Sequence, residues 1–126
     1  MGQNKDSKPA ANILVVDDEE NIRFLFEKAM KKAGYGCRVT ENGEQALAAM
    51  ENEPFDVVIS DIAMPGMDGI ELSKRIVEKY PSDIIVMTGK VRSYHYHEII
   101  SIGASDFVEK PFVIQELILR VKRVLR

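Results

Sequence analysis

The chain has 126 residues, 45% of them hydrophobic, and a formal net charge of −3. This length suits one domain, and the interspersed acidic and basic residues exclude an extended basic surface, so we expect no direct binding of nucleic acid. No apolar stretch is long enough to span a membrane or form a signal peptide, and we expect no membrane association. The single cysteine, Cys37, cannot form an intramolecular disulfide, which favours the reducing cytoplasm.

The predicted elements alternate between strands and helices along the chain. Residues 1–11 are small and polar and predict a flexible tail, followed by one domain over residues 12–126. Short runs rich in β-branched residues predict strands over 12–16, 37–40, 56–60, 83–87 and 106–109. Apolar residues recur at helical spacing over 22–30 and 114–125, and helices are also expected over about 43–52, 69–80 and 93–102.

This alternation predicts an α/β fold. Strands that are apolar nearly throughout belong to a parallel sheet covered by helices on both faces, here a five-stranded, doubly wound sheet. Right-handed crossovers leave a few strand orders open. In such sheets the functional site lies beyond the carboxyl ends of the strands, near the point where the strand order reverses.

Polar side chains leave four of the predicted strands at that edge. They are Asp17 and Asp18 after the first strand, Asp61 after the third, Thr88 after the fourth and Lys110 after the fifth. Three carboxylates close together repel one another, so the cluster predicts a cation, and oxygen ligands suit Mg²⁺. With the Lys110 ammonium and the Thr88 hydroxyl, such a site would stabilise the charge of a phosphoryl transfer in which Asp61 is the nucleophile.

Two other sites with this fold class fit the sequence poorly. A dinucleotide site needs a glycine-rich turn after the first strand, where this chain has "DDEEN". An aspartyl-nucleophile hydrolase of the haloacid dehalogenase type needs a second aspartate two residues after its nucleophile. That position is Ala63 after Asp61 and Glu19 after Asp17, so the general acid/base is missing.

Four motifs in combination resemble the receiver domain of two-component response regulators, including single-domain regulators of the chemotaxis and sporulation type. They are "VVDDEEN" at 15–21, "SDIAMPGMDG" at 60–69, "VMTG" at 86–89 and "GASDFVEKPF" at 103–112. The resemblance covers the chain from Asn12 to its end. It implies a flavodoxin-like strand order 2-1-3-4-5 with five helices, and a cytoplasmic switch of a two-component phosphorelay.

The resemblance also implies a role for each residue of the acidic cluster. Asp61 would accept the phosphoryl group from the phosphohistidine of a histidine kinase or phosphotransfer protein. Asp18 and Asp61 would bind Mg²⁺ directly, together with the backbone carbonyl of Ala63, while Asp17 assists. The chain would catalyse its own phosphorylation and slow autodephosphorylation, and would not otherwise be an enzyme.

Further implications concern the switch. Thr88 would move to the phosphoryl group and Phe107 would repack with it, and the signal would pass through the face formed by the fourth helix, fifth strand and fifth helix. Lys110 must point into the site while the chain turns into the next helix, so we expect a cis Lys110–Pro111 bond. Leu119 lies off the apolar stripe of the last helix and favours a docking surface or a phosphorylation-dependent dimer on that face.

The lifetime of the phosphorylated state depends on the residues beside the attacking water. Ala63 and Lys90, two residues past Asp61 and Thr88, flank that approach, and neither can accept a hydrogen bond through its side chain from the water. We therefore expect a lifetime of minutes or longer.

Three classes of function remain open. One is a switch acting through an unknown output partner, and another is the receiver piece of a longer DNA-binding regulator or hybrid kinase. The third is an aspartyl-phosphate phosphatase, which Ala63 disfavours.

A metal site shared by His95 and His97 is disfavoured, because residues two apart on a helix point in different directions.

Overall fold

The computed structural model describes residues 8–89 and 96–126, in which strands alternate with helices. The strands are β1 Asn12–Val16, β2 Gly36–Thr40, β3 Val57–Asp61, β4 Asp83–Thr88 and β5 Asp106–Glu109. The helices are α1 Glu20–Lys32, α2 Gly43–Asn52, α3 Gly69–Lys79, α4 Tyr96–Ser101 and α5 Ile114–Val124. Each lies where the sequence predicts an element, with small differences at its ends, and residues 93–95 of the fourth predicted helix lie outside the described residues.

The strands form one parallel sheet in the order β2-β1-β3-β4-β5, which confirms the predicted doubly wound, flavodoxin-like fold. The last residue of β1, Val16, pairs with Thr40 of β2 on one side and with Ser60 of β3 on the other. The strand order therefore reverses between β1 and β3. The loops that leave these two strands diverge, which creates a crevice at their carboxyl ends.

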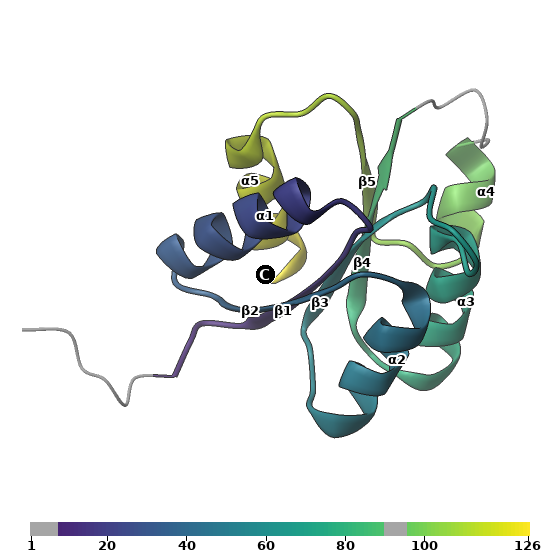
Figure 1. Ribbon diagram of the computed structural model, residues 1–126, viewed down its shortest axis with the longest axis horizontal. Helices are drawn as coiled ribbons and strands as arrows, with labels where there is room; N and C mark the ends of the chain where they lie inside the picture. Colours follow the sequence, from purple (N-terminus) through teal and green to yellow (C-terminus); the bar gives the residue numbers. More distant parts are fainter. Residues whose placement is uncertain (1–7, 90–95) are drawn as a thin grey trace, which may run out of the picture.

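Helices cover both faces of the sheet and explain why its strands are apolar throughout. Figure 1 shows α1 and α5 on one face and α2, α3 and α4 on the other. Alternate strand residues enter two separate cores, because successive side chains of a strand point to opposite faces. Leu14 and Val58 pack toward α2 and α3, whereas Ile13 and Ile59 pack toward α1 and α5.

Helices α2 and α3 both begin with an N-cap whose side chain accepts a backbone hydrogen bond. The Asn42 side chain accepts a hydrogen bond from the Gln45 N–H at 2.8 Å, and the Asp68 side chain accepts one from the Glu71 N–H at 2.9 Å. Both are N-caps, which satisfy a backbone donor that the helix itself leaves free. The cap at Asp68 fixes the start of the helix that follows Asp61.

The apolar stripe of α1 is narrower than its sequence suggests. Phe26 and Met30 are fully buried, but Leu25, on the same predicted face, is 43% exposed. Leu119 on α5 is 64% exposed, as the sequence predicts.

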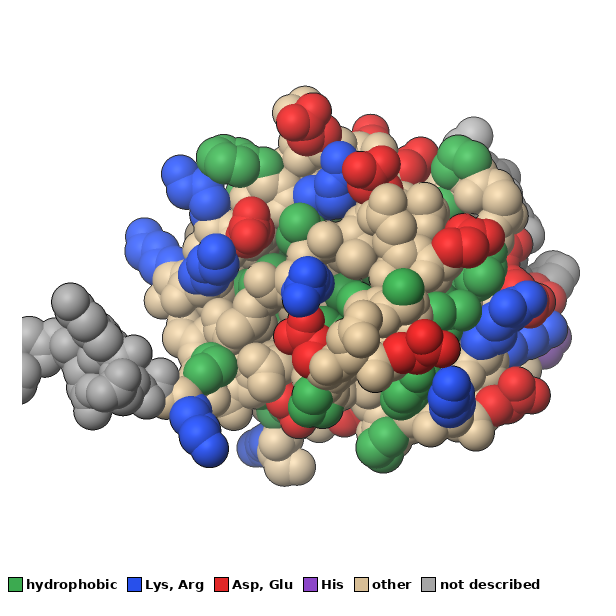
Figure 2. Space-filling model, turned by 60° about the horizontal axis from the view of Figure 1, so that its bottom comes forward, with side chains coloured by type: hydrophobic (Ala, Val, Ile, Leu, Met, Phe, Trp, Pro, Cys, Tyr) green, Lys and Arg blue, Asp and Glu red, His purple; other side chains and the backbone are tan. Residues whose placement is uncertain are grey.

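Acidic and basic side chains are intermingled on the face shown in Figure 2. No helix within 8–89 or 96–126 combines the length and the apolar character needed to cross a bilayer.

Candidate functional site

Three aspartates meet at the crevice between β1 and β3. Asp17 directly follows β1, and its N–H donates to the Thr40 carbonyl at 3.1 Å, which continues the pairing with β2 by one residue. Asp61 is the last residue of β3. One carboxylate oxygen from each of Asp17, Asp18 and Asp61 lies within 4.8 Å of the others. Asp17 and Asp61 are buried and Asp18 is exposed, so the cluster opens to solvent on one side.

The carboxylate of Asp17 is held on one side only. Its Oδ1 accepts a hydrogen bond from the Glu19 N–H at 2.8 Å, and Arg23 donates to its backbone carbonyl at 2.7 Å. Its Oδ2 is buried and accepts no hydrogen bond from the residues that the structure describes. Burial raises the pKa of Asp17 from 3.8 to about 6, and the neighbouring charge of Asp61 adds to the rise.

Lys110 supplies the positive charge in the crevice. Its Nζ lies 3.0 Å from Asp61 Oδ2 and 4.0 Å from Asp17 Oδ2. Partial burial alone would lower the pKa of Lys110, but the hydrogen bond and the negative charge of Asp61 outweigh it and raise that pKa. The Lys110 N–H donates to the Thr88 carbonyl at 2.8 Å, and the Lys110–Pro111 peptide bond is cis, the geometry expected from the sequence.

The loop after Asp61 begins and ends on hydrogen bonds of one residue, Ile62, whose N–H and carbonyl belong to successive peptide groups. The Ile62 N–H donates to the Met87 carbonyl of β4 at 2.9 Å, and the Ile62 carbonyl accepts from the Gly69 N–H at 2.8 Å. Between these points the chain passes outward, and Ala63 is exposed at the rim, with its N–H 3.4 Å from Asp61 Oδ1. The loop is thus tied to the sheet and to α3 at the residue after the nucleophile candidate.

The remaining predicted site residues are placed in part. Thr88 ends β4 and is buried, and Phe107 on β5 is half-buried and packs against the core on the α2 and α3 side. Lys90 and His95 lie outside the described residues, and His97 is exposed on α4.

The donor set fits a hard divalent cation. Three carboxylates face one nearby ammonium, so the crevice carries an excess of negative charge. Carboxylate oxygens are ligands that Mg²⁺ prefers. The buried Oδ2 of Asp17, which accepts no hydrogen bond from the described residues, would accept one from a water ligand of the ion or bind the ion itself. The residues present therefore fit the predicted magnesium site.

The sequence profile of the response regulator receiver domain matches residues 13–122. The chain belongs to this family. Receiver domains are signalling domains of two-component systems rather than classical enzymes; they interact with histidine kinases, and the family generally binds Mg²⁺. The chain is 37% identical over 126 residues to the transcriptional regulatory protein ResD of Bacillus subtilis, a match that covers 100% of this chain and 51% of ResD. It thus spans about half the length of that relative.

Solved structures of receiver domains agree with this fold. The chemotaxis response regulator CheY4 of Vibrio cholerae superposes with a TM-score of 0.84 at 32% identity, over 90% of this chain and 98% of CheY4. The response regulator TrrA of Thermotoga maritima, solved in complex with Mg²⁺ and BeF, superposes with a TM-score of 0.80 at 36% identity, over 90% of this chain and 98% of TrrA.

Two residues near the receiver site were not identified from the sequence. Arg23 lies one turn into α1 and reaches back to Asp17, and Gly69 begins α3 against the peptide after Asp61. The spacing of Arg23 from the acidic run carries no specific signal. Gly69 has one, because a glycine directly after an N-cap has no role in capping and suggests a close approach of backbone.

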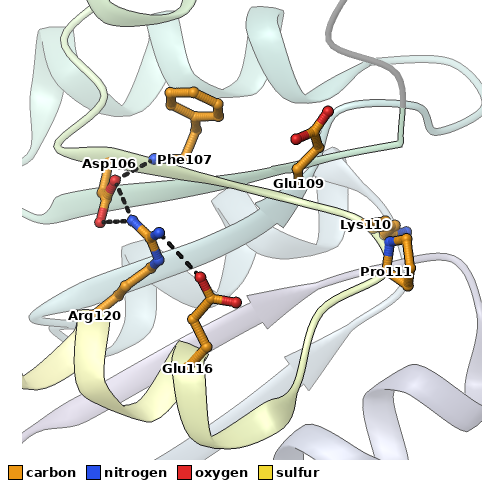
Figure 3. Close-up of a pocket in the computed structure, with 7 residues that line it drawn as sticks. All are labelled: Asp106, Phe107, Glu109, Lys110, Pro111, Glu116 and Arg120. Carbon is orange, nitrogen blue, oxygen red and sulfur yellow. Dashed lines mark hydrogen bonds and ion pairs between the residues drawn. The ribbon is translucent and has the colours of Figure 1, made fainter.

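A second charged cluster lies where β5 meets α5 (Figure 3). Arg120 of α5 holds both carboxylate oxygens of Asp106 at 2.9 and 2.8 Å and also bonds to Glu116 at 3.1 Å. Phe107 and Glu109 point to the other side of the strand (Figure 3). Together with Lys110 and Pro111 these residues line an open pocket on the face predicted to carry the signal.

Proposed function

We propose that the chain is a phosphorylatable signalling switch that accepts a phosphoryl group on Asp61. The observation that carries this proposal is the crevice itself, where the buried Asp61 carboxylate bonds to Lys110 at 3.0 Å beside two further carboxylates. A carboxylate held by the rigid end of a strand is pre-organised for attack, and a carboxylate oxygen can act as a nucleophile without a neighbouring general base.

The phosphodonor is the phosphohistidine of a histidine kinase or a phosphotransfer protein. A bond forms between an Asp61 carboxylate oxygen and phosphorus, while the phosphorus–nitrogen bond to the donor imidazole breaks and its electron pair returns to the ring. The Lys110 ammonium lies within reach of the new phosphoryl oxygens, which take over from Asp61 as its partner. Thr88 donates its hydroxyl to the phosphoryl group, and Phe107 repacks with it.

Asp18, Asp61 and the Ala63 carbonyl would hold Mg²⁺ directly, and Asp17 would assist through its unpaired Oδ2. When bound, the ion would neutralise the carboxylates and the phosphoryl oxygens. The presence of Mg²⁺ and BeF in the structure of TrrA supports this assignment.

The signal leaves through the face formed by α4, β5 and α5, toward an output partner or a second copy of the chain. The exposed Leu119 and the charged groups of Asp106 and Arg120 lie on this face, so it offers both apolar and ionic contacts. The switch acts in the cytoplasm, and it contacts neither membrane nor nucleic acid through this domain.

Intact-mass spectrometry tests the assignment of Asp61. Wild-type protein incubated with acetyl phosphate and Mg²⁺ should gain one phosphoryl mass, and Asp61→Asn should gain none. Chelation of Mg²⁺ should suppress the gain in wild type. A phosphoryl mass on Asp61→Asn would show that another residue is the acceptor.

A second candidate is the receiver part of a longer regulator with a DNA-binding output domain or of a hybrid kinase. The coverage of 51% of ResD, a transcriptional regulatory protein, favours it. The chemistry at Asp61 is the same in both cases. Reading the gene on both sides of this sequence distinguishes them.

A further inference from the structure

We propose that Gly69 is a positioning residue of the site, because its missing side chain lets the first turn of α3 pack directly on the Asp61–Ile62 peptide. The inference rests on the proposed function of Asp61 and adds a residue that determines where Asp61 and the Ala63 carbonyl lie. Gly69 is buried and donates its N–H to the Ile62 carbonyl at 2.8 Å.

The contact at Gly69 leaves no room for a methyl group. A Cβ at this position would lie 2.7 Å from Ile62 Cα and closer still to the Asp61 carbonyl oxygen. Both neighbours are backbone atoms, which cannot rotate away as a side chain can. On its other side the same peptide is bonded to β4, where the Ile62 N–H donates to Met87 at 2.9 Å.

The Asp61–Ile62 peptide is therefore clamped between β4 and the start of α3. A methyl group at residue 69 must displace either this peptide or α3. Both movements lengthen the hydrogen bond from the Gly69 N–H to the Ile62 carbonyl. Two of the three ligand groups assigned to Mg²⁺ flank this clamp, since Asp61 precedes the peptide and Ala63 follows it. A shift of the peptide moves the Asp61 carboxylate and the Ala63 carbonyl relative to Asp18.

Gly43 provides a matched control. It is also the first residue of a helix, it is also buried, and it also follows an N-cap. A Cβ at Gly43 would meet the Met67 side chain, with the sulfur at 2.6 Å, and a flexible thioether can move aside. The same substitution at the same helix position therefore tests a backbone contact in one case and a side-chain contact in the other.

Gly103 provides a control for loss of stability. Its φ is +100°, and a Cβ there would lie 2.9 Å from Val77 Cγ2, so Gly103→Ala is strained at a site remote from the crevice. If Gly69→Ala acted only by loosening the fold, Gly103→Ala with a similar melting temperature would change Mg²⁺ binding equally.

The experiment measures Mg²⁺ affinity by amide chemical shifts, phosphorylation by acetyl phosphate at saturating Mg²⁺, and the melting temperature of the metal-free protein. We expect Gly69→Ala to weaken Mg²⁺ binding by about tenfold or more and to slow phosphorylation at saturating Mg²⁺. Gly43→Ala and Gly103→Ala should keep the wild-type affinity. Wild-type affinity and rate in folded Gly69→Ala, or an equal loss in Gly103→Ala, would overturn the proposal.

Two further arms complete the test. If Gly69→Ala does not fold, Asp68→Ala removes the cap that holds the same turn and should weaken Mg²⁺ binding, whereas Asn42→Ala at the equivalent cap of α2 should not. Unchanged affinity in Asp68→Ala would then count against the proposal. If wild type binds Mg²⁺ but gains no phosphoryl mass, the proposed function fails, while the Mg²⁺ titrations still decide the role of Gly69.

Discussion

The molecule holds two aspartate–cation pairs of opposite character. At the edge of the sheet, Arg120 donates to both oxygens of Asp106 and also to Glu116, and the hydrogen bonds that Asp106 accepts raise the pKa of Arg120. In the crevice, Lys110 bonds to Asp61 at a single 3.0 Å contact, and two more carboxylates lie beside it. Around Arg120 two carboxylates face one guanidinium, whereas in the crevice three carboxylates face one ammonium, so the crevice has the larger excess of negative charge.

The contrast between these two clusters separates a reactive site from a structural ion pair. Both oxygens of Asp106 accept hydrogen bonds from Nη1 of Arg120, so this carboxylate is fully paired. A single ammonium among three carboxylates leaves an excess of negative charge and an Asp17 oxygen that accepts no hydrogen bond from the described residues, both of which an added cation can satisfy. The excess charge in the crevice, rather than the presence of charged residues, identifies the site.

The largest effect on the phosphorylation rate should come from replacing Lys110, with the replacement of Arg120 as the comparison. We expect Lys110→Met to slow phosphorylation by acetyl phosphate by a factor of about 10²–10³, because the new phosphoryl oxygens lose their ammonium partner. Arg120→Met removes the cation of the Asp106 pair and should leave the rate within about twofold, since Arg120 bonds to Asp106 and Glu116 and to none of the three crevice carboxylates. Intact-mass time courses at saturating Mg²⁺ measure both rates. Equal slowing in the two variants would remove the distinction between the pairs.

The next effect concerns stability and pH. Burial keeps the pKa of Asp17 near 6 in the folded protein against an ordinary value of 3.8, so between about pH 4 and 6 the folded state binds more protons than the unfolded state. The free energy of unfolding of metal-free protein should therefore fall as pH rises through this window and stay low above it. The loss amounts to about 2–3 kcal/mol, at about 1.4 kcal/mol per pKa unit.

Asp17→Asn should recover most of that loss at pH 8, because the neutral amide can still accept from Glu19 through its oxygen. Asp106→Asn should do the reverse and destabilise by about 1 kcal/mol, since it weakens a paired carboxylate. Urea unfolding of both variants at pH 4 and pH 8 without Mg²⁺ measures this. A metal-free Asp17→Asn protein no more stable than wild type at pH 8 would contradict the argument, and added Mg²⁺ should stabilise wild type more than the variant.

The smallest effect concerns the rim of the crevice, where Ala63 is exposed. Ala63→Asn combined with Lys90→Glu adds hydrogen-bond acceptors for the attacking water and should shorten a phosphorylated lifetime of minutes by several-fold. Ala48→Asn with Lys74→Glu makes the same changes at exposed positions of α2 and α3 and should leave the lifetime unchanged. Phosphate release in Mg²⁺ measures the decay. Wild-type decay within seconds, or no acceleration in the rim variant, would refute the prediction.

Much of this site could be anticipated from local sequence patterns. Residues that end parallel strands must share one edge of the sheet, so the strand pattern alone brings Asp17, Asp61 and Thr88 to that edge. The cap at Asp68 follows from residue type and position. The exposure of Leu25 could not be anticipated, because helical periodicity identifies a face but not how far its neighbours cover that face.

The alternation of strands and helices, the parallel sheet and the acidic residues at its carboxyl edge all follow from the sequence, since each depends on periodicity or on strand direction. The tertiary contacts show in addition that Asp17 has one oxygen hydrogen-bonded and the other buried with no hydrogen bond from the described residues, and that Asp61 faces Lys110 at 3.0 Å. They also show that Gly69 packs on the Asp61–Ile62 peptide. These contacts join segments far apart in the chain, and their geometry depends on how helices pack on the sheet, which no local pattern encodes.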